Sequence, residues 1–183
     1  QPIADTIGIG GLFRPLRTAP VVMAFGHDME QVCPDAWFLN YTNPMCAVTG
    51  ALLRGTSIRG VGLCHSVQVC APRLLEYVGM EPARDLQWKI AGINHQAWLL
   101  EITDGGKDLY PEIKKRAARI VKEARKKGAD KPRDMVRLEL MRHFGYYITE
   151  SSEHSSEYMP YWIKSNYPEL IEEFNIPLDE YPR

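Results

Sequence analysis

Cys64 and His95 are the residues of this sequence whose chemistry points most directly to a metal. Each lies just after a short apolar run typical of a strand, and their positions are 31 residues apart. A thiolate and an imidazole are good ligands for a borderline divalent ion, and two protein ligands leave positions open for substrate oxygens. By residue type alone, the alternatives are a small buried hydrophobe and a hydrogen-bonded core histidine. The pair predicts a metal site only if the two side chains meet in the fold.

A second group of reactive side chains lies in the nine residues from Glu150 to Tyr158, which hold three carboxylates, an imidazole and a phenol. Tyr158 could act as a base, because a cation nearby favours phenolate over phenol. Glu153 and His154 could orient that phenol or contact a ligand. A helix that begins with a serine cap followed by glutamate explains part of the same pattern. Both interpretations remain open from the sequence.

Two loop motifs bear on nucleotide binding. Asn43 stands before Pro44 at the end of an apolar run, where it either starts a turn or hydrogen bonds to a ligand. Gly8, Gly10 and Gly11 do not form a dinucleotide fingerprint, because no strand precedes them and the GxGxxG spacing is absent. If a dinucleotide binds, its pyrophosphate is held elsewhere.

These residues are positioned by strands that alternate with helices. The pattern predicts strands over 36–41, 60–63, 88–92 and 97–103, and helices over 21–31, 46–54, 66–78, 110–128 and 134–144. Residues 1–20 are expected to be a glycine-rich loop. The alternation predicts an α/β fold with a mostly parallel sheet, in which ligands bind beyond the carboxyl ends of the strands. Asn43, Cys64-His65 and Asn94-His95 fall at such ends.

Composition excludes several classes of function. The 183 residues carry a net charge of -1, which offers no global field for nucleic acid or an anionic membrane. No apolar stretch approaches the roughly 20 residues that span a bilayer. The basic stretch 110–128 has one apolar stripe and no interleaved aromatics, so it is interpreted as a solvated helix. The four cysteines form no CxxC pair and indicate reduced thiols in a cytoplasmic protein.

Four motifs in order resemble glycoside hydrolase family 4. They are NYTNPMCAVTGAL at 40–52, GLCHSVQ at 62–68, AGINHQAWLL at 91–100 and FGYYITESSEHSSEYMPYW at 144–162. The resemblance covers essentially the whole chain. It implies the second half of a Rossmann-like sheet, similar to that of lactate and malate dehydrogenases, followed by a mixed α+β catalytic region. The Rossmann-like half is expected over residues 1–103 and the catalytic region over residues 104–183.

The resemblance implies an unusual glycosidase mechanism, an exception to the scheme that uses two carboxylates. NAD oxidises the sugar at C3, which acidifies the hydrogen at C2; a base removes that proton, and a divalent ion, usually manganese, stabilises the enediolate. The glycosidic oxygen then leaves, water adds, and the hydride returns.

Individual positions of the family carry over by motif. The resemblance implies Cys64 and His95 as metal ligands and Tyr158 as the base at C2. The resemblance places His65 at the position where some relatives carry a proposed general acid. It also implies that Asn43 contacts the substrate and the cofactor. Asn94, Glu153 and His154 are expected to bind substrate or cofactor.

The tetrad at 64–67 resembles that of members that act on unphosphorylated α-galactosides such as melibiose, and the segments 64–68 and 94–98 contain no cation for a phosphate. The alternatives are an α-glucosidase or α-glucuronidase of the same family, a lactate/malate-type 2-hydroxyacid dehydrogenase, which needs no metal, or a non-enzymatic remnant that serves interaction or sugar binding. The phosphate-binding glycines of the family are missing, so turnover is expected of a longer, oligomeric protein rather than of this chain alone. The expected partner is a small sugar, not a nucleic acid or a membrane.

Overall fold

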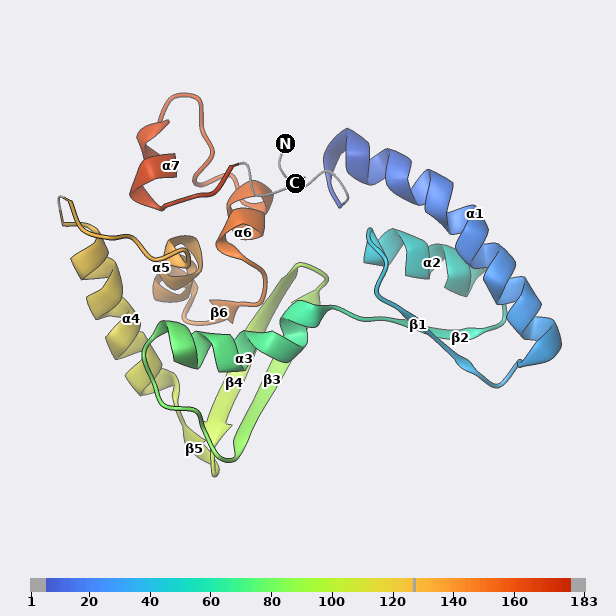
Figure 1. The fold of residues 1–183 in the computed structure, drawn as a ribbon, viewed down its shortest axis with the longest axis horizontal. Coiled ribbons are helices and arrows are strands. Elements are labelled where there is room, and N and C mark those ends of the chain that lie inside the picture. The colour runs from blue at the N-terminus through green and yellow to red at the C-terminus, as the bar shows by residue number, and fades with distance from the viewer. Residues whose placement is uncertain (1–5, 127, 179–183) are drawn as a thin grey trace. The chain divides into compact units, whose positions relative to one another are not determined.

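A computed structural model describes residues 6–126 and 128–178, which form two compact units (Figure 1). One unit is built from residues up to Cys64, and the other runs from His65 to Pro177. The predicted division after residue 103 remains a prediction. Within the described ranges, no helix is long and apolar enough to cross a membrane.

The first unit is a short parallel βαβ arrangement packed on a long helix. Strand β1 (Trp37–Asn40) pairs in parallel with β2 (Arg59–Gly62), and α2 (Met45–Gly55) connects them. Parallel neighbours need such a crossover. The side chain of Asn40 is buried at the end of β1 and donates a hydrogen bond to Thr49 Oγ1 of α2 at 2.9 Å. This contact ties the end of the strand to the helix that follows it.

The predicted loop over residues 1–20 is wrong from Gly8 onward, while the expected helix at 21–31 forms. Both belong to α1 (Gly8–Val32), which contains Pro15 and Pro20. Prolines inside a helix each remove one backbone hydrogen bond, so local preference disfavours this helix. Tertiary packing stabilises the C-terminal half of this helix. Gly26 is buried so close to Leu52 of α2 that an added Cβ would lie 2.7 Å from the leucine Cδ1. Residues 1–5 of the predicted loop lie outside the described residues.

Glu30 links α1 to the loop before β2. Its Oε1 accepts hydrogen bonds from the Ser57 backbone N at 2.6 Å and from Ser57 Oγ at 2.8 Å, and its Oε2 lies 2.9 Å from His27 Nδ1. The hydrogen bond from His27, followed by those from Ser57, lowers the pKa of Glu30 to about 2. A carboxyl with a lowered pKa stabilises the fold above its ordinary pKa, and that contribution is lost as pH falls toward the folded value.

Glu30→Gln should therefore lower the thermal midpoint of the chain at pH 7. The difference from the parent chain should shrink as pH falls from about 4.5 to about 2, because the parent glutamate loses its charge in that window. Thermal unfolding measured across this range checks the prediction, with Asp28→Asn, an exposed position on the same helix, as the control. If the difference in thermal midpoint between Glu30→Gln and the parent chain stays constant down to about pH 2, the charge of Glu30 contributes nothing to the stability of the fold.

The second unit contains an antiparallel sheet covered by helices. Strand β4 (Gln96–Asp104) pairs with β3 (Leu86–Ile93), with β5 (Lys107–Asp108) and with β6 (Tyr147–Ile148), all antiparallel. The expectation of a mostly parallel sheet is wrong here. Only Asn94 and His95 separate β3 from β4, and two residues suffice for a hairpin but not for a parallel crossover.

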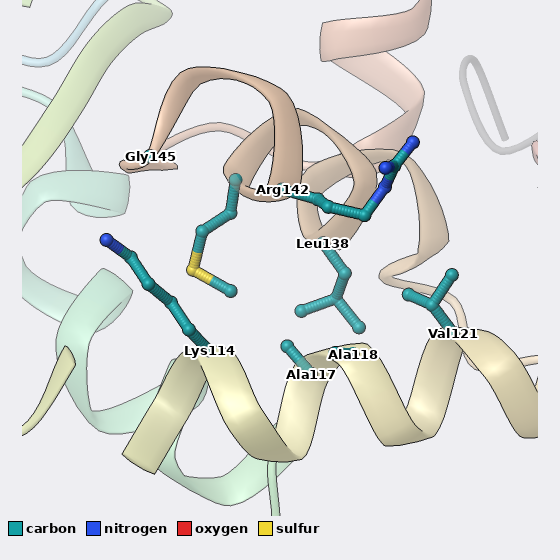
Figure 2. Close-up of a pocket in the computed structure, with 8 residues that line it drawn as sticks. Lys114, Ala117, Ala118, Val121, Leu138, Arg142 and Gly145 are labelled. Carbon is teal, nitrogen blue, oxygen red and sulfur yellow. The ribbon is translucent and has the colours of Figure 1, made fainter. Parts of the chain in front are cut away.

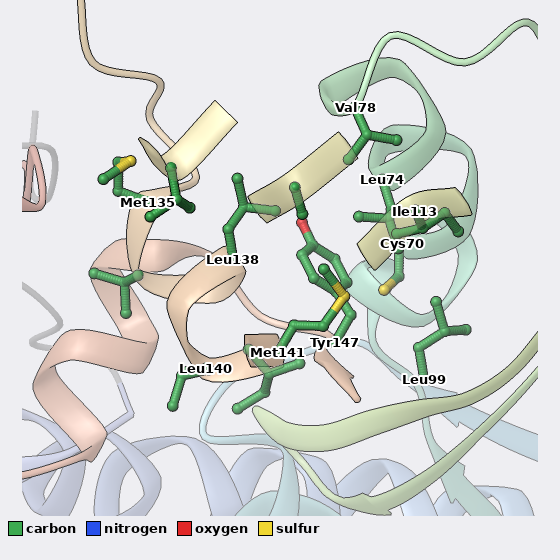
Figure 3. Packing of buried hydrophobic residues seen from close by; sticks show 14 of the residues in the cluster. Cys70, Leu74, Val78, Leu99, Ile113, Met135, Leu138, Leu140, Met141 and Tyr147 are labelled. Carbon is green, nitrogen blue, oxygen red and sulfur yellow. The ribbon is translucent and has the colours of Figure 1, made fainter. Parts of the chain in front are cut away.

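The helices of this unit enclose one hydrophobic core. They are α3 (His65–Tyr77), α4 (Tyr110–Ala124), α5 (Met135–Phe144), α6 (Ser152–Tyr158) and α7 (Glu169–Glu173). Figure 3 shows side chains of α3, α4, α5 and the sheet meeting in this core, among them Leu74, Leu99, Ile113 and Leu138. In α5, all seven residues from Met135 to Met141 are buried. The apolar stripe predicted for the basic helix 110–128 is confirmed as the buried side of α4.

A hollow of about 230 Å³ lies between α4 and α5 (Figure 2). Lys114 and Arg142 line it together with apolar side chains that include Ala117, Val121 and Leu138. Arg142 Nη2 donates a hydrogen bond to Glu139 Oε1 at 2.7 Å, so its charge is already paired. None of the candidate site residues lines this hollow.

Candidate metal and proton-transfer site

His95 occupies the turn between β3 and β4 in a left-handed conformation with φ of 62°. Its side chain is only 7% exposed, and its two ring nitrogens face different partners. Nδ1 lies 2.9 Å from the Tyr158 hydroxyl oxygen, and Nε2 lies 3.5 Å from Glu150 Oε2. The ring is thus held between a phenol from α6 and a carboxylate from the loop that follows β6.

Glu150 reaches His95 through the register of the sheet. The Thr149 backbone N donates to the Ala97 carbonyl oxygen at 2.9 Å, which aligns the chain before Glu150 with the start of β4. Ser66 Oγ, in the first turn of α3, donates to Glu150 Oε1 at 2.7 Å. One carboxylate oxygen is therefore held by α3, and the other faces the imidazole.

Cys64 completes this cluster. It immediately precedes His65, the first residue of α3, and its Sγ, a ring nitrogen of His95 and a carboxylate oxygen of Glu150 all lie within 4.8 Å of one another. Sulfur, nitrogen and oxygen donors together suit a borderline divalent ion. Three protein ligands leave positions open on such an ion for oxygens of a substrate. The donor set fits a divalent metal.

Helix α6 carries the remaining reactive side chains. Ser151 caps its N-terminus, accepting a hydrogen bond from the His154 backbone N at 3.2 Å, and Ser151 Oγ also lies 2.9 Å from His154 Nδ1. The His154 ring meets the His95 ring edge-on, with centroids 5.3 Å apart, and the Tyr158 ring edge-on at 6.0 Å. The capping interpretation of the serine–glutamate run is confirmed for Ser151, and the same helix brings His154 and Tyr158 to His95.

Comparison with known proteins decides the family. Residues 1–80 match the sequence model of the family 4 glycosyl hydrolases, and residues 90–183 match that of the family 4 glycosyl hydrolase C-terminal domain. The chain belongs to glycosyl hydrolase family 4.

Individual relatives of this family 4 chain agree with that assignment. It is 62% identical to an alpha-galactosidase of Bacillus subtilis over all 183 residues, which span 40% of that protein. The crystal structure of the Bacillus subtilis protein lplD superimposes with a TM-score of 0.77 at 26% identity, over 97% of this chain and 43% of that one. A 6-phospho-alpha-glucosidase from gut microorganisms, solved in complex with NAD and Mn²⁺, gives a TM-score of 0.63 at 26% identity, over 95% and 39%. The mixed α/β fold predicted from the sequence is confirmed by these structures.

The other predicted site residues of the family 4 chain are placed as follows. Glu153 is buried in α6 at 2% exposed. Asn94 precedes His95 in the hairpin turn, and its Nδ2 is buried without a hydrogen-bond partner among the described residues. His65 is exposed at the start of α3.

In the first unit, Asn43 forms a cis peptide bond with Pro44, and its carbonyl oxygen accepts a hydrogen bond from Arg14 Nε at 3.0 Å. The roles of these residues remain predictions.

Sequence reasoning gave no role to Glu150 or Ser66. Glu150 belonged to the conspicuous run of carboxylates, and its place two residues after the short apolar run Tyr147-Ile148 was the available signal. Ser66 had no such signal, because its hydrogen bond to Glu150 joins positions 84 residues apart.

Proposed function

We propose that this chain is the metal-binding and proton-transfer segment of an α-galactosidase that uses NAD and a divalent ion, manganese being the first candidate. The observation that carries the proposal is the convergence of Cys64, His95 and Glu150, with Tyr158 on the far side of the imidazole. The relationship to an alpha-galactosidase supports the substrate, and that to a protein solved with NAD and Mn²⁺ supports the cofactors. Because the chain spans 40% of the first relative, turnover belongs to a protein of the relatives' length that carries this segment.

Within the proposed site, Cys64, His95 and Glu150 would hold the metal. When bound, the metal supplies positive charge beside the sugar hydroxyls, and NAD supplies the reversible oxidation at C3 that the family's mechanism requires. The described residues contain no strand followed by a glycine-rich turn and a helix, and Gly8, Gly10 and Gly11 lie in the first turn of α1. The described residues therefore do not fit the pyrophosphate of NAD.

Tyr158 is the proposed base for the C2 proton. A histidine that offers Nε2 to a metal carries its own proton on Nδ1, so His95 would donate to the Tyr158 oxygen across their 2.9 Å contact. A hydrogen bond donated to the oxygen stabilises its anionic form, which is the form that accepts a proton. His154 and Glu153 would orient the phenol or bind sugar hydroxyls, and His65 and Asn43 are proposed near the leaving oxygen and the cofactor, respectively.

The substrate is proposed to be a neutral α-galactoside, handled in the cytoplasm by an oligomeric enzyme. Neither of the segments 64–68 and 94–98 contains a lysine or arginine that could pair with a phosphate. A panel of nitrophenyl α- and β-glycosides, with galactoside, glucoside, glucuronide and 6-phosphoglycoside members, tests this in a protein of the relatives' length. The α-galactoside should have the highest kcat/KM; preference for a 6-phosphoglycoside would refute the neutral-sugar assignment.

A further inference from the structure

Arg137 is a buried cation in the middle of α5. Arg137 is 6% exposed, and all the residues around it on the helix, from Met135 to Met141, are buried. Removing a guanidinium from water is costly, and a well-packed apolar side chain of similar volume commonly serves the stability of a fold as well or better. A buried arginine at such a position calls for a role besides stability.

The guanidinium directs its donors to the backbone that leads into the metal cluster. Nε and Nη2 donate to the Ile148 carbonyl oxygen at 3.1 and 2.9 Å, and Nη2 also donates to the Thr149 carbonyl oxygen at 3.0 Å. Both carbonyls belong to the two residues before Glu150. The arginine therefore holds the end of β6 where the chain turns toward the cluster.

A second set of contacts fixes the guanidinium itself. Nη1 lies 3.3 Å from Asp134 Oδ1, while Asp134 Oδ2 accepts a hydrogen bond from the Tyr147 hydroxyl. The guanidinium carbon lies 4.1 Å from the centre of the Tyr147 ring. Although burial alone lowers the pKa of Arg137, the nearby Tyr147 and Asp134 outweigh burial and raise it, so the side chain stays charged. Asp134 and Tyr147 thus hold the planar guanidinium of Arg137 in one orientation.

Thr149 is consequently held from two directions. Its backbone N donates to the Ala97 carbonyl oxygen, two residues after His95, and its own carbonyl oxygen accepts from Arg137. Because Glu150 directly follows Thr149, these two hydrogen bonds also restrict where the backbone of Glu150 can lie relative to β4. The Arg137 backbone N also donates to Ser152 Oγ at 3.4 Å, which links α5 to the first residue of the helix that carries Tyr158.

We infer that Arg137 is a positioning residue of the metal site, setting Glu150 against His95 by holding the Ile148 and Thr149 carbonyls. This inference rests on the proposed function, since it requires a metal at Cys64, His95 and Glu150. A planar fork can hold two carbonyls at once, whereas a lysine ammonium on a flexible stem cannot reproduce that geometry. Arg137→Lys keeps the positive charge beside Asp134 and removes the fork.

The test is Mn²⁺ affinity in a protein of the relatives' length that carries this segment, measured by the electron paramagnetic resonance of the free ion. Arg137→Lys should raise the Kd about 10- to 100-fold, the range observed when groups that orient metal ligands are lost. With Co²⁺ as the probe, the thiolate charge-transfer band should also change in shape, because the carboxylate ligand is displaced. Ile113→Val, at a fully buried position of α4, is the control, because it is expected to lower the thermal midpoint without removing a hydrogen bond to the Ile148 or Thr149 carbonyl oxygen.

The outcomes separate this inference from the proposed function. Wild-type Mn²⁺ affinity and an unchanged Co²⁺ spectrum in a folded Arg137→Lys chain would show that Arg137 serves stability alone. If Arg137→Lys does not fold, Asp134→Asn removes the anion that orients the fork, and the same loss of affinity is expected; wild-type affinity there would overturn the inference. Wild-type affinity in Cys64→Ala would instead refute the metal site itself, and with it the proposed function.

Discussion

Cys64→Ala should weaken Mn²⁺ binding more than about 100-fold, because losing a ligand costs more than losing a group that orients one. The substitution removes the only sulfur among the three donors that lie within 4.8 Å of one another. His95 and Glu150 then face the ion without the thiolate. Titration of the chain with Mn²⁺, read as free ion, measures the effect directly. In a protein of the relatives' length, hydrolysis of an α-galactoside should fall with the occupancy of the site.

The matched control is Cys46→Ala, since Cys46 is an exposed free cysteine of α2 outside the cluster. Its Mn²⁺ affinity should equal that of the parent chain. Mild oxidation should mimic Cys64→Ala in the parent protein and be reversed by a thiol reductant, because a sulfenic acid or disulfide no longer offers a thiolate. Equal affinities for Cys64→Ala and Cys46→Ala would eliminate Cys64 as a ligand.

Tyr158→Phe should slow exchange of the substrate's C2 hydrogen with solvent deuterium by at least about 100-fold, the lower end of what a general base contributes. The measurement uses a protein of the relatives' length, with NAD and saturating Mn²⁺, and follows deuterium in the sugar. Saturating metal is needed because the Tyr158 hydroxyl also contacts His95 Nδ1. Loss of this hydroxyl is expected to weaken Mn²⁺ binding about tenfold.

Two variants delimit the assignment of the base. Tyr161→Phe alters a half-exposed tyrosine three residues away and should leave exchange at the parent rate. Glu153→Gln tests the buried carboxylate of the same helix. If Glu153→Gln abolishes exchange while Tyr158→Phe exchanges at the parent rate, the base is Glu153 and the proposed role of Tyr158 is wrong.

Local pattern predicted most of the elements that carry the site. Apolar runs bounded by Asn43-Pro44 and by Cys64 correctly indicated β1 and β2, and the helical spacing after each indicated α2 and α3. The helix over residues 8–20 was missed because glycines and prolines disfavour it locally, whereas its continuation packs on α2. Tertiary packing is not visible in such a short window of sequence.

Residue chemistry made Cys64, His95 and Tyr158 candidates, and the family resemblance gave each of them a specific role. In the structure, the Tyr158 hydroxyl lies 2.9 Å from His95 Nδ1. Glu150 could not be assigned from spacing, because its approach to His95 depends on an antiparallel register between β6 and β4. The expected parallel sheet would have placed these side chains differently. The antiparallel pairing of β6 with β4 is therefore what adds Glu150 to the proposed site.

Dependence of hydrolysis on NAD tests the central claim most directly. A protein of the relatives' length that carries this segment should be stripped of NAD and metal, then assayed on nitrophenyl α-galactoside with each, both or neither restored. Turnover is predicted only with both, and the released galactose should carry solvent deuterium at C2 when the assay is run in deuterium oxide. Hydrolysis at an undiminished rate without NAD, with no deuterium at C2, would contradict the account.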